Sequence, residues 1–156
     1  MPYYAVPGNQ GTVSSSYKTA AQLNATGSTK RGKVYDIMVG ASANPNATDT
    51  FVQWDISRIS ATGAGAYTEW TPTLLDPADG AAVLVSGINA TAEATTITAN
   101  SSLWNTAVNQ RGTYRWVAAQ ESQNLVIPAT SGAGLILRAL STTYTGSVVG
   151  QFSYQE

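Results

Sequence analysis

The sequence contains neither cysteine nor histidine in its 156 residues. Without them the chain cannot form a disulfide, a zinc–thiolate site, or a Ser–His–Asp or Cys–His catalytic group. Charged residues are also scarce, at 11% of the chain, and the formal net charge is -1. So small a net charge gives no electrostatic attraction to nucleic acid or to an anionic membrane. We therefore expect neither of them as a partner.

Targeting and membrane-spanning segments are missing as well. The first residues carry no basic region and no apolar core of the kind found in a secretory signal. No apolar run approaches the length of about 20 residues that a membrane-spanning helix needs. We therefore expect a soluble protein that is made in a cytoplasm.

Small hydroxyl and methyl side chains dominate the composition. Ser and Thr together number 35 and Ala numbers 23, whereas Val, Ile, Leu and Phe together number only 30. Four Trp and eight Tyr supply large apolar surfaces that compensate for the few aliphatic residues. A hydroxyl-rich, charge-poor surface suits exposed strands, where Thr is favoured, and a protein that packs against neighbours. The length is sufficient for one domain with a core of its own.

Short strands separated by turn residues are predicted from residue 17 onwards. Apolar and polar residues alternate with a period of two between Gly-, Pro-, Asn- and Asp-rich turns. The predicted strands are residues 17–25, 34–39, 52–57, 67–70, one that opens with Val83 and Val85, and then 94–98, 113–118, 125–127, 135–140 and 148–154. Pro128 places the strand before it at an edge or makes it end there. This pattern predicts an all-β fold, a single antiparallel β-sandwich or jelly roll over residues 17–156.

One stretch departs from the strand rhythm. Four apolar residues between 103 and 108 recur at i, i+1, i+4 and i+5, which would gather them on one side of a helix. Polar residues 100–102 could cap its start, and Arg111-Gly112 could end it. The sequence therefore predicts one short helix here.

The first 16 residues carry two prolines, two glycines and a run of three serines, which predicts an extended N-terminal arm. Tyr3, Tyr4 and Val6 are its apolar residues. Either they pack on the chain's own sandwich as a first edge strand, or the arm reaches a neighbouring subunit and buries aromatic anchors there. On the second interpretation these three residues bind a partner.

A basic turn at residues 27–33, GSTKRGK, imitates a phosphate-binding loop. The motif requires Ser or Thr next, to hold Mg²⁺, and requires a helix to follow; here Val34 and a strand follow instead. The segment is therefore interpreted as a hairpin turn. Its charges, Lys30, Arg31 and Lys33, are candidates for contact with an acidic neighbouring subunit.

Other reactive patterns are equally incomplete. Ser15 and Lys18 match S-x-x-K, but the supporting S-D-N and K-T-G elements are absent. Asp76 and Asp79 are close in sequence, yet both lie in Asp-Pro and Asp-Gly turns that account for them. We predict no catalytic, cofactor-binding or metal-binding residue, and we expect that the protein is not an enzyme.

Several segments resemble small structural proteins of tailed bacteriophages. They are YYAVP (residues 3–7), KVYDIMVG (33–40), NATAE to TANSSL (89–103) and NQR to YRWVAA (109–119). The resemblance implies a jelly-roll capsid decoration, or cement, protein without cofactors. Such a protein would bind the major capsid protein on the outside of the virion after synthesis in the host cytoplasm. It would act as a homo-oligomer, with a trimer favoured and a dimer possible.

Two other functions stay open at this point. A carbohydrate- or receptor-binding module of a tail fibre would use exposed Trp side chains as stacking platforms. Another virion component, such as a head–tail connector or a tail-tube subunit, would share the same composition. The number of copies per particle separates these alternatives.

Overall fold

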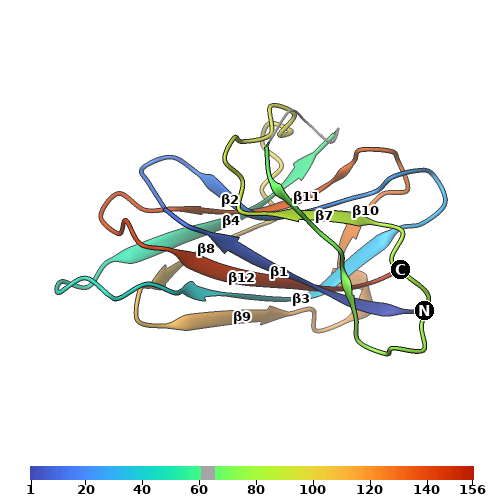
Figure 1. Cartoon of the computed structure of the whole chain (residues 1–156), viewed down its shortest axis with the longest axis horizontal. Helices are drawn as coiled ribbons and strands as arrows, with labels where there is room; N and C mark the ends of the chain where they lie inside the picture. The colour runs from blue at the N-terminus through green and yellow to red at the C-terminus, as the bar shows by residue number, and fades with distance from the viewer. Residues whose placement is uncertain (61–65) are drawn as a thin grey trace.

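The computed structural model describes residues 1–60 and 66–156. Two antiparallel sheets pack face to face as a β-sandwich (Figure 1). In the first sheet, the path is β10 (Leu125–Ile127), β3 (Gly32–Ala41), β12 (Val148–Gln155), β1 (Tyr3–Gln10) and β6 (Thr73–Leu74), with β9 (Thr113–Val117) also beside β3. The second sheet runs β5 (Thr68–Trp70), β7 (Val85–Ile88), β2 (Lys18–Asn24), β11 (Gly134–Leu140), β4 (Phe51–Ile59) and β8 (Trp104–Asn109). The all-β prediction is confirmed; the jelly-roll connectivity remains a prediction.

The core lies between the two sheets and is filled by alternate residues of the central strands. On β12 these are Val148, Phe152 and Tyr154, and on β4 they include Trp54, all of them fully buried. The predicted faces of both strands are therefore confirmed. Two glycines bring the sheets close together: a Cβ on Gly8 would lie 2.8 Å from the Cβ of Ala21, and one on Gly150 would lie 2.6 Å from Leu137. Small residues are thus needed where the sheets approach each other most closely.

The N-terminal segment is part of the sandwich. Residues 3–10 form β1, which pairs along its whole length with β12 and, at Tyr4 and Ala5, also with β6. Of the two interpretations left open, the structure therefore shows packing on the chain's own sandwich, although β1 has neighbours on both sides rather than being a simple edge. Pro7 lies beyond the residues that pair with β6, where a missing backbone N–H is tolerated.

The helix predicted over residues 103–108 is wrong. This stretch is β8, which pairs with β4 from Phe51 to Ile56. An apolar pattern of i, i+1, i+4 and i+5 does not exclude a strand, and β-branched Thr106 and Val108 favour one. Among the described residues the one helical element is a single 3₁₀ turn, Glu121–Gln123.

The strand predicted over residues 94–98 is also wrong. That segment makes one isolated bridge, between Ile97 and Ile59, and is otherwise irregular. It belongs to the connection 89–103, whose position on the second sheet is described next.

Candidate interaction surface

The outer face of the first sheet is not covered by any other segment of the described chain. Its outward side chains come from β9, β3, β12 and β1, which lie side by side in the lower half of Figure 1. Strand register places them on one face, because Met38 lies between Arg115 and Gln151, and Asp36 lies between Val117 and Ser153. We call this surface the open face and define it by Tyr3, Asp36, Met38, Thr113, Arg115, Val117, Val149, Gln151 and Ser153.

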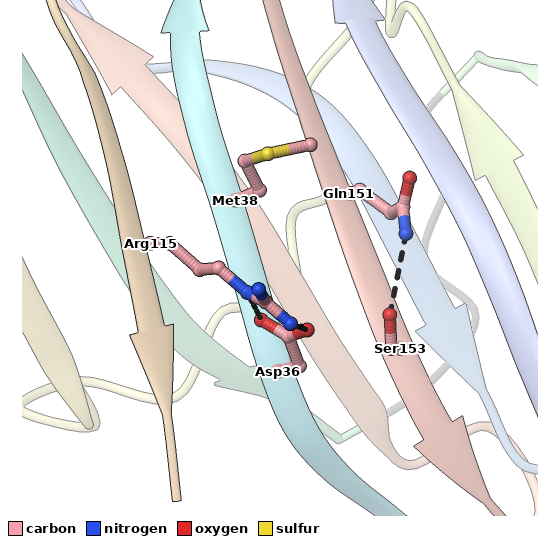
Figure 2. A pocket seen from close by; sticks show the side chains of 5 residues that line it. All are labelled: Asp36, Met38, Arg115, Gln151 and Ser153. Carbon is pink, nitrogen blue, oxygen red and sulfur yellow. Dashed lines mark hydrogen bonds and ion pairs between the residues drawn. The ribbon is translucent and has the colours of Figure 1, made fainter.

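A single ion pair occupies the centre of the open face (Figure 2). Nε and Nη2 of Arg115 donate hydrogen bonds to the Asp36 carboxylate at 2.6 to 3.1 Å. Beside them, Nε2 of Gln151 donates to Oγ of Ser153 at 3.2 Å. Together with Met38, these side chains line a shallow hollow of about 170 Å³. The charges there are paired with each other, so the surface is effectively neutral.

Apolar side chains surround this ion pair. Met38, Val117 and Val149 are 46%, 51% and 43% exposed. Met38 and Val149 also line a second hollow of about 240 Å³, with Thr113 at its border. At the end of the sheet, the ring of Tyr3 meets the edge of Tyr35 at a centroid distance of 5.7 Å. The open face thus combines exposed apolar groups with hydroxyl and amide groups, and it contains no deep cavity.

The outer face of the second sheet is covered by the chain itself. Its outward side chains are buried although they point away from the core; we call this the covered face and define it by Gln22, Asp55, Ser57, Ile136 and Arg138. Residues 89–103 run across it. At β2 the Glu93 carboxylate accepts hydrogen bonds from the N–H and the hydroxyl of Thr19, and at β4 the Ser102 hydroxyl donates to Asp55.

A buried ion pair lies on the covered face. Nη2 of Arg138 donates to Oδ2 of Asp55 at 2.6 Å, and their side chains are only 14% and 3% exposed. The guanidinium also lies 4.5 Å from the centroid of the Tyr17 ring. Burial alone would raise the pKa of the Asp55 carboxyl, but hydrogen bonds from Ser102, Ser57 and Arg138, together with the charge of Arg138, lower it below its ordinary value. The members of this cluster satisfy one another's hydrogen bonds within the fold.

The structure separates the six residues predicted to bind a partner. Tyr4 and Val6 are buried in the chain's own core, and the Tyr4 hydroxyl donates to the carbonyl of Gly80 at 2.8 Å. They are therefore core residues, which corrects the predicted role. Tyr3 is exposed on the open face.

The three basic residues lie at two places. Lys33 forms an ion pair with Glu121, N···O 2.5 Å, and this interaction lowers the pKa of the Glu121 carboxyl. Glu121 lines a hollow with Tyr3, so Lys33 borders the same end of the open face. Lys30 and Arg31 are exposed on the turn before β3 and have no ion-pair partner among the described residues. Their predicted contact with a neighbouring subunit stays a prediction.

Sequence reasoning missed the residues that make the open face apolar. Met38 and Val149 alternate with core residues, so the strand period places them on the outer face of the sheet. An apolar residue at an outer position was the signal in the sequence that could have indicated an interaction surface. The register that places Met38, Val117 and Val149 on one face joins segments from three distant parts of the chain.

One further groove contains an exposed Trp. Trp54 is fully buried and Trp104 and Trp116 are half-buried, whereas Trp70 is 41% exposed. Trp70, Tyr67 and Glu69 line a groove of about 480 Å³ together with Thr71, Pro72, Ala82, Leu84, Val85 and Ser86. The groove lies at the β5 edge of the second sheet.

No group of three or more His, Cys, Asp or Glu side chains that could hold a metal ion occurs in residues 1–60 and 66–156. Within the same residues, no helix is long and apolar enough to cross a membrane. The sequence matches no protein-family model and no curated protein.

Proposed function

We propose that the protein is a capsid decoration protein that binds the outside of a bacteriophage shell through its open face. The observation that supports this most directly is the contrast between its two outer faces. The chain covers one face with its own residues 89–103 and leaves the other bare, with apolar side chains exposed on it. Exposed apolar groups gathered on one surface are typical of protein interaction sites.

The chemistry of the open face fits a protein partner better than a small ligand. Its hollows are shallow, whereas ligand sites usually bury most of the ligand in a cleft. Arg115 and Asp36 already satisfy each other, so docking leaves no unpaired charge buried. A stable interface takes about 800 Å² from each partner. That is a small part of the 7468 Å² surface of this chain.

The proposed partner is the major capsid protein in its assembled form. Many copies that bind the shell but not its dissociated subunits would stabilise the shell by mass action. This function requires complementarity of surfaces and no reactive group. The resemblance to phage structural proteins in residues 33–40 and 109–119 falls on β3 and β9, which supply part of the open face.

The test is binding to emptied shells of the phage that carries the gene. A Met38→Glu, Val149→Glu double variant places two charges in the apolar part of the open face, and we expect at least a tenfold loss of binding by co-sedimentation. The control is Phe51→Glu, an exposed apolar residue on β4 of the second sheet and therefore outside the open face. Failure of the wild-type protein to bind shells, or equal binding by the double variant, would refute the proposal.

The Trp70 groove favours a second candidate function, carbohydrate binding. An exposed indole can stack on a sugar ring, while the Glu69 carboxylate and the Thr71 hydroxyl can accept or donate hydrogen bonds to sugar hydroxyls. The backbone of Trp70 is held in place, because the Ser86 hydroxyl donates to its carbonyl at 2.6 Å.

A glycan array probed with the wild type and with Trp70→Ala tests this candidate. Hits that disappear in Trp70→Ala but persist in a Leu75→Ala control would support it. An array without hits for the wild type would remove it.

A further inference from the structure

The last strand of the second sheet has a free edge. β8 pairs with β4 on one side, and no other strand of the described chain lies on the other side. Six residues, WNTAVN, form this edge. A free edge of this length presents unpaired backbone donors and acceptors to the solvent.

The register of β8 on β4 identifies which groups are unpaired. The N–H of Gln110 donates to the carbonyl of Thr50 at 3.0 Å, so these two residues form a hydrogen-bonded pair. Antiparallel ladders alternate between hydrogen-bonded and non-hydrogen-bonded pairs. The backbone groups of Trp104, Thr106 and Val108 therefore point to β4, and those of Asn105 and Ala107 point outward.

This edge lacks the features by which proteins usually prevent strand addition. It contains no Lys, no Pro and no charged residue, and its register on β4 has no bulge. Other strands carry such features: β9 has Arg115, β5 has Glu69, and β10 is followed directly by Pro128. β8 is the longest strand with an unprotected edge in the described part of the chain.

The outward groups of β8 are complementary to themselves. When two copies of β8 run antiparallel about a two-fold axis at Thr106, Asn105 of one copy lies opposite Ala107 of the other. Both such pairs are then of the hydrogen-bonded type, which gives four backbone hydrogen bonds across the axis. No like charges meet, and half-buried Trp104 lies opposite Val108 of the second copy.

The side chains around the edge favour the same arrangement. The ring of Trp104 lies 5.8 Å from the ring of Tyr114, and both Tyr114 and Leu103 are exposed beside β8. A second copy that approaches the edge covers these apolar groups. Aromatic residues of this kind are enriched in the buried centres of interfaces.

We propose that two copies of the chain join edge to edge through β8 into a two-fold dimer with one continuous sheet. The occupant of this edge is thus a second copy of the same protein. The dimer replaces the trimer that the resemblance favours.

The geometry has one consequence for attachment. The two-fold axis of an antiparallel strand pair is perpendicular to the sheet, so both open faces of the dimer point in the same direction. A dimer would therefore bind a surface through two sites at once and gain avidity. This consequence, unlike the dimer itself, rests on the proposed capsid function.

Cross-linking tests the register directly, because the chain has no cysteine of its own. In Thr106→Cys the two thiols face each other across the axis, within the Cα separation that a disulfide requires. We expect this variant to form a covalent dimer on mild oxidation. In the control Asn109→Cys, six residues separate the thiols along the pair of strands, which is about 20 Å, and no covalent dimer is expected.

Sedimentation of the full chain tests the association itself. Ala107→Pro removes an outward N–H that β4 does not use, so the monomer should keep its unfolding temperature while dimer affinity falls at least tenfold. Ala47→Lys, in an exposed loop, is compared with Ala107→Lys as the matched charge control. Three results would overturn the proposal. The wild type could be monomeric even at millimolar concentration, or it could sediment as a trimer. The third is that both Ala107 variants associate as tightly as the wild type.

Discussion

The two outer faces of the sandwich carry the same pair of side chains in opposite environments. On the covered face, Arg138 and Asp55 are 14% and 3% exposed, and Asp55 accepts further hydrogen bonds from the hydroxyls of Ser57 and Ser102. On the open face, Arg115 is 64% exposed although Asp36 is only 13% exposed, and the Arg115 guanidinium bonds Asp36 alone. The Arg138–Asp55 pair is enclosed by other parts of the chain, whereas the Arg115–Asp36 pair lies at the surface and leaves that surface without net charge. The difference indicates which face the chain has completed by itself and which it leaves for another molecule.

The largest expected effect comes from breaking the buried pair. Arg138→Ala leaves the Asp55 charge buried without its partner and removes the contact with Tyr17. Such a change costs about 3–5 kcal/mol. The equivalent change on the open face, Arg115→Ala, should cost much less, because the Arg115 guanidinium is solvent-exposed and its attraction to Asp36 is screened by water. Urea unfolding of both variants measures the two free energies, and equal losses would contradict the comparison.

The second largest loss of stability is expected from acid, which should protonate Asp55 on the covered face. The pKa of Asp55 is lower in the folded protein than its ordinary value of 3.8. Its contribution to stability is therefore complete above that value and is lost as the pH falls through the folded pKa. The loss is smaller than in Arg138→Ala, because the protonated carboxyl is neutral and its carbonyl oxygen still accepts hydrogen bonds, whereas that variant leaves a carboxylate charge buried without its partner.

The matched variant for this prediction is Asp55→Asn, which has no charge to lose. Its difference in unfolding free energy from the wild type should shrink as the pH falls below 3.8. A difference that stays constant down to the acid transition would show that Asp55 is not the group responsible.

A smaller effect is expected from the segment that covers this face. Ser102→Ala removes one hydroxyl hydrogen bond to a buried carboxylate, which is worth about 1.5 kcal/mol. Ser153→Ala on the open face removes a hydroxyl that accepts from Gln151 and also hydrogen-bonds Tyr35; both partners are neutral, and the change should cost roughly 1 kcal/mol. Thermal unfolding compares the two, and the reverse order would contradict the assignment of the faces.

The smallest effect on stability is expected where the proposed interface is. Met38→Gln changes a half-exposed side chain that makes no core contact, so the free energy of unfolding should change by less than about 0.5 kcal/mol. Chemical denaturation checks this. A loss above about 1 kcal/mol would mean that Met38 supports the fold rather than a partner.

Local pattern was sufficient for most strands. Val148, Phe152 and Tyr154 were predicted on one face of β12 because a strand alternates its side chains, and they are in the core. Pro128 predicted an edge strand or a strand end before it, and β10 is an edge strand that ends at Ile127.

The failures occurred where pairing outweighed local preference. Residues 104–109 have an apolar pattern compatible with a helix, but the free edge of β4 pairs with them as a strand. Residues 3–10 carry two breakers of regular structure, Pro7 and Gly8. They nevertheless form a strand, because β12 pairs with all eight residues. In both cases backbone hydrogen bonds to a distant segment decided the conformation.

The sequence by itself determined the fold class and the lack of thiol and imidazole groups, since composition and a period of two are local properties. Only the tertiary structure decided which face is open and which is covered. That distinction depends on where residues 89–103 cross the second sheet and on the register of β3, β9 and β12. Both are set by contacts between residues far apart in the chain, which no local pattern records.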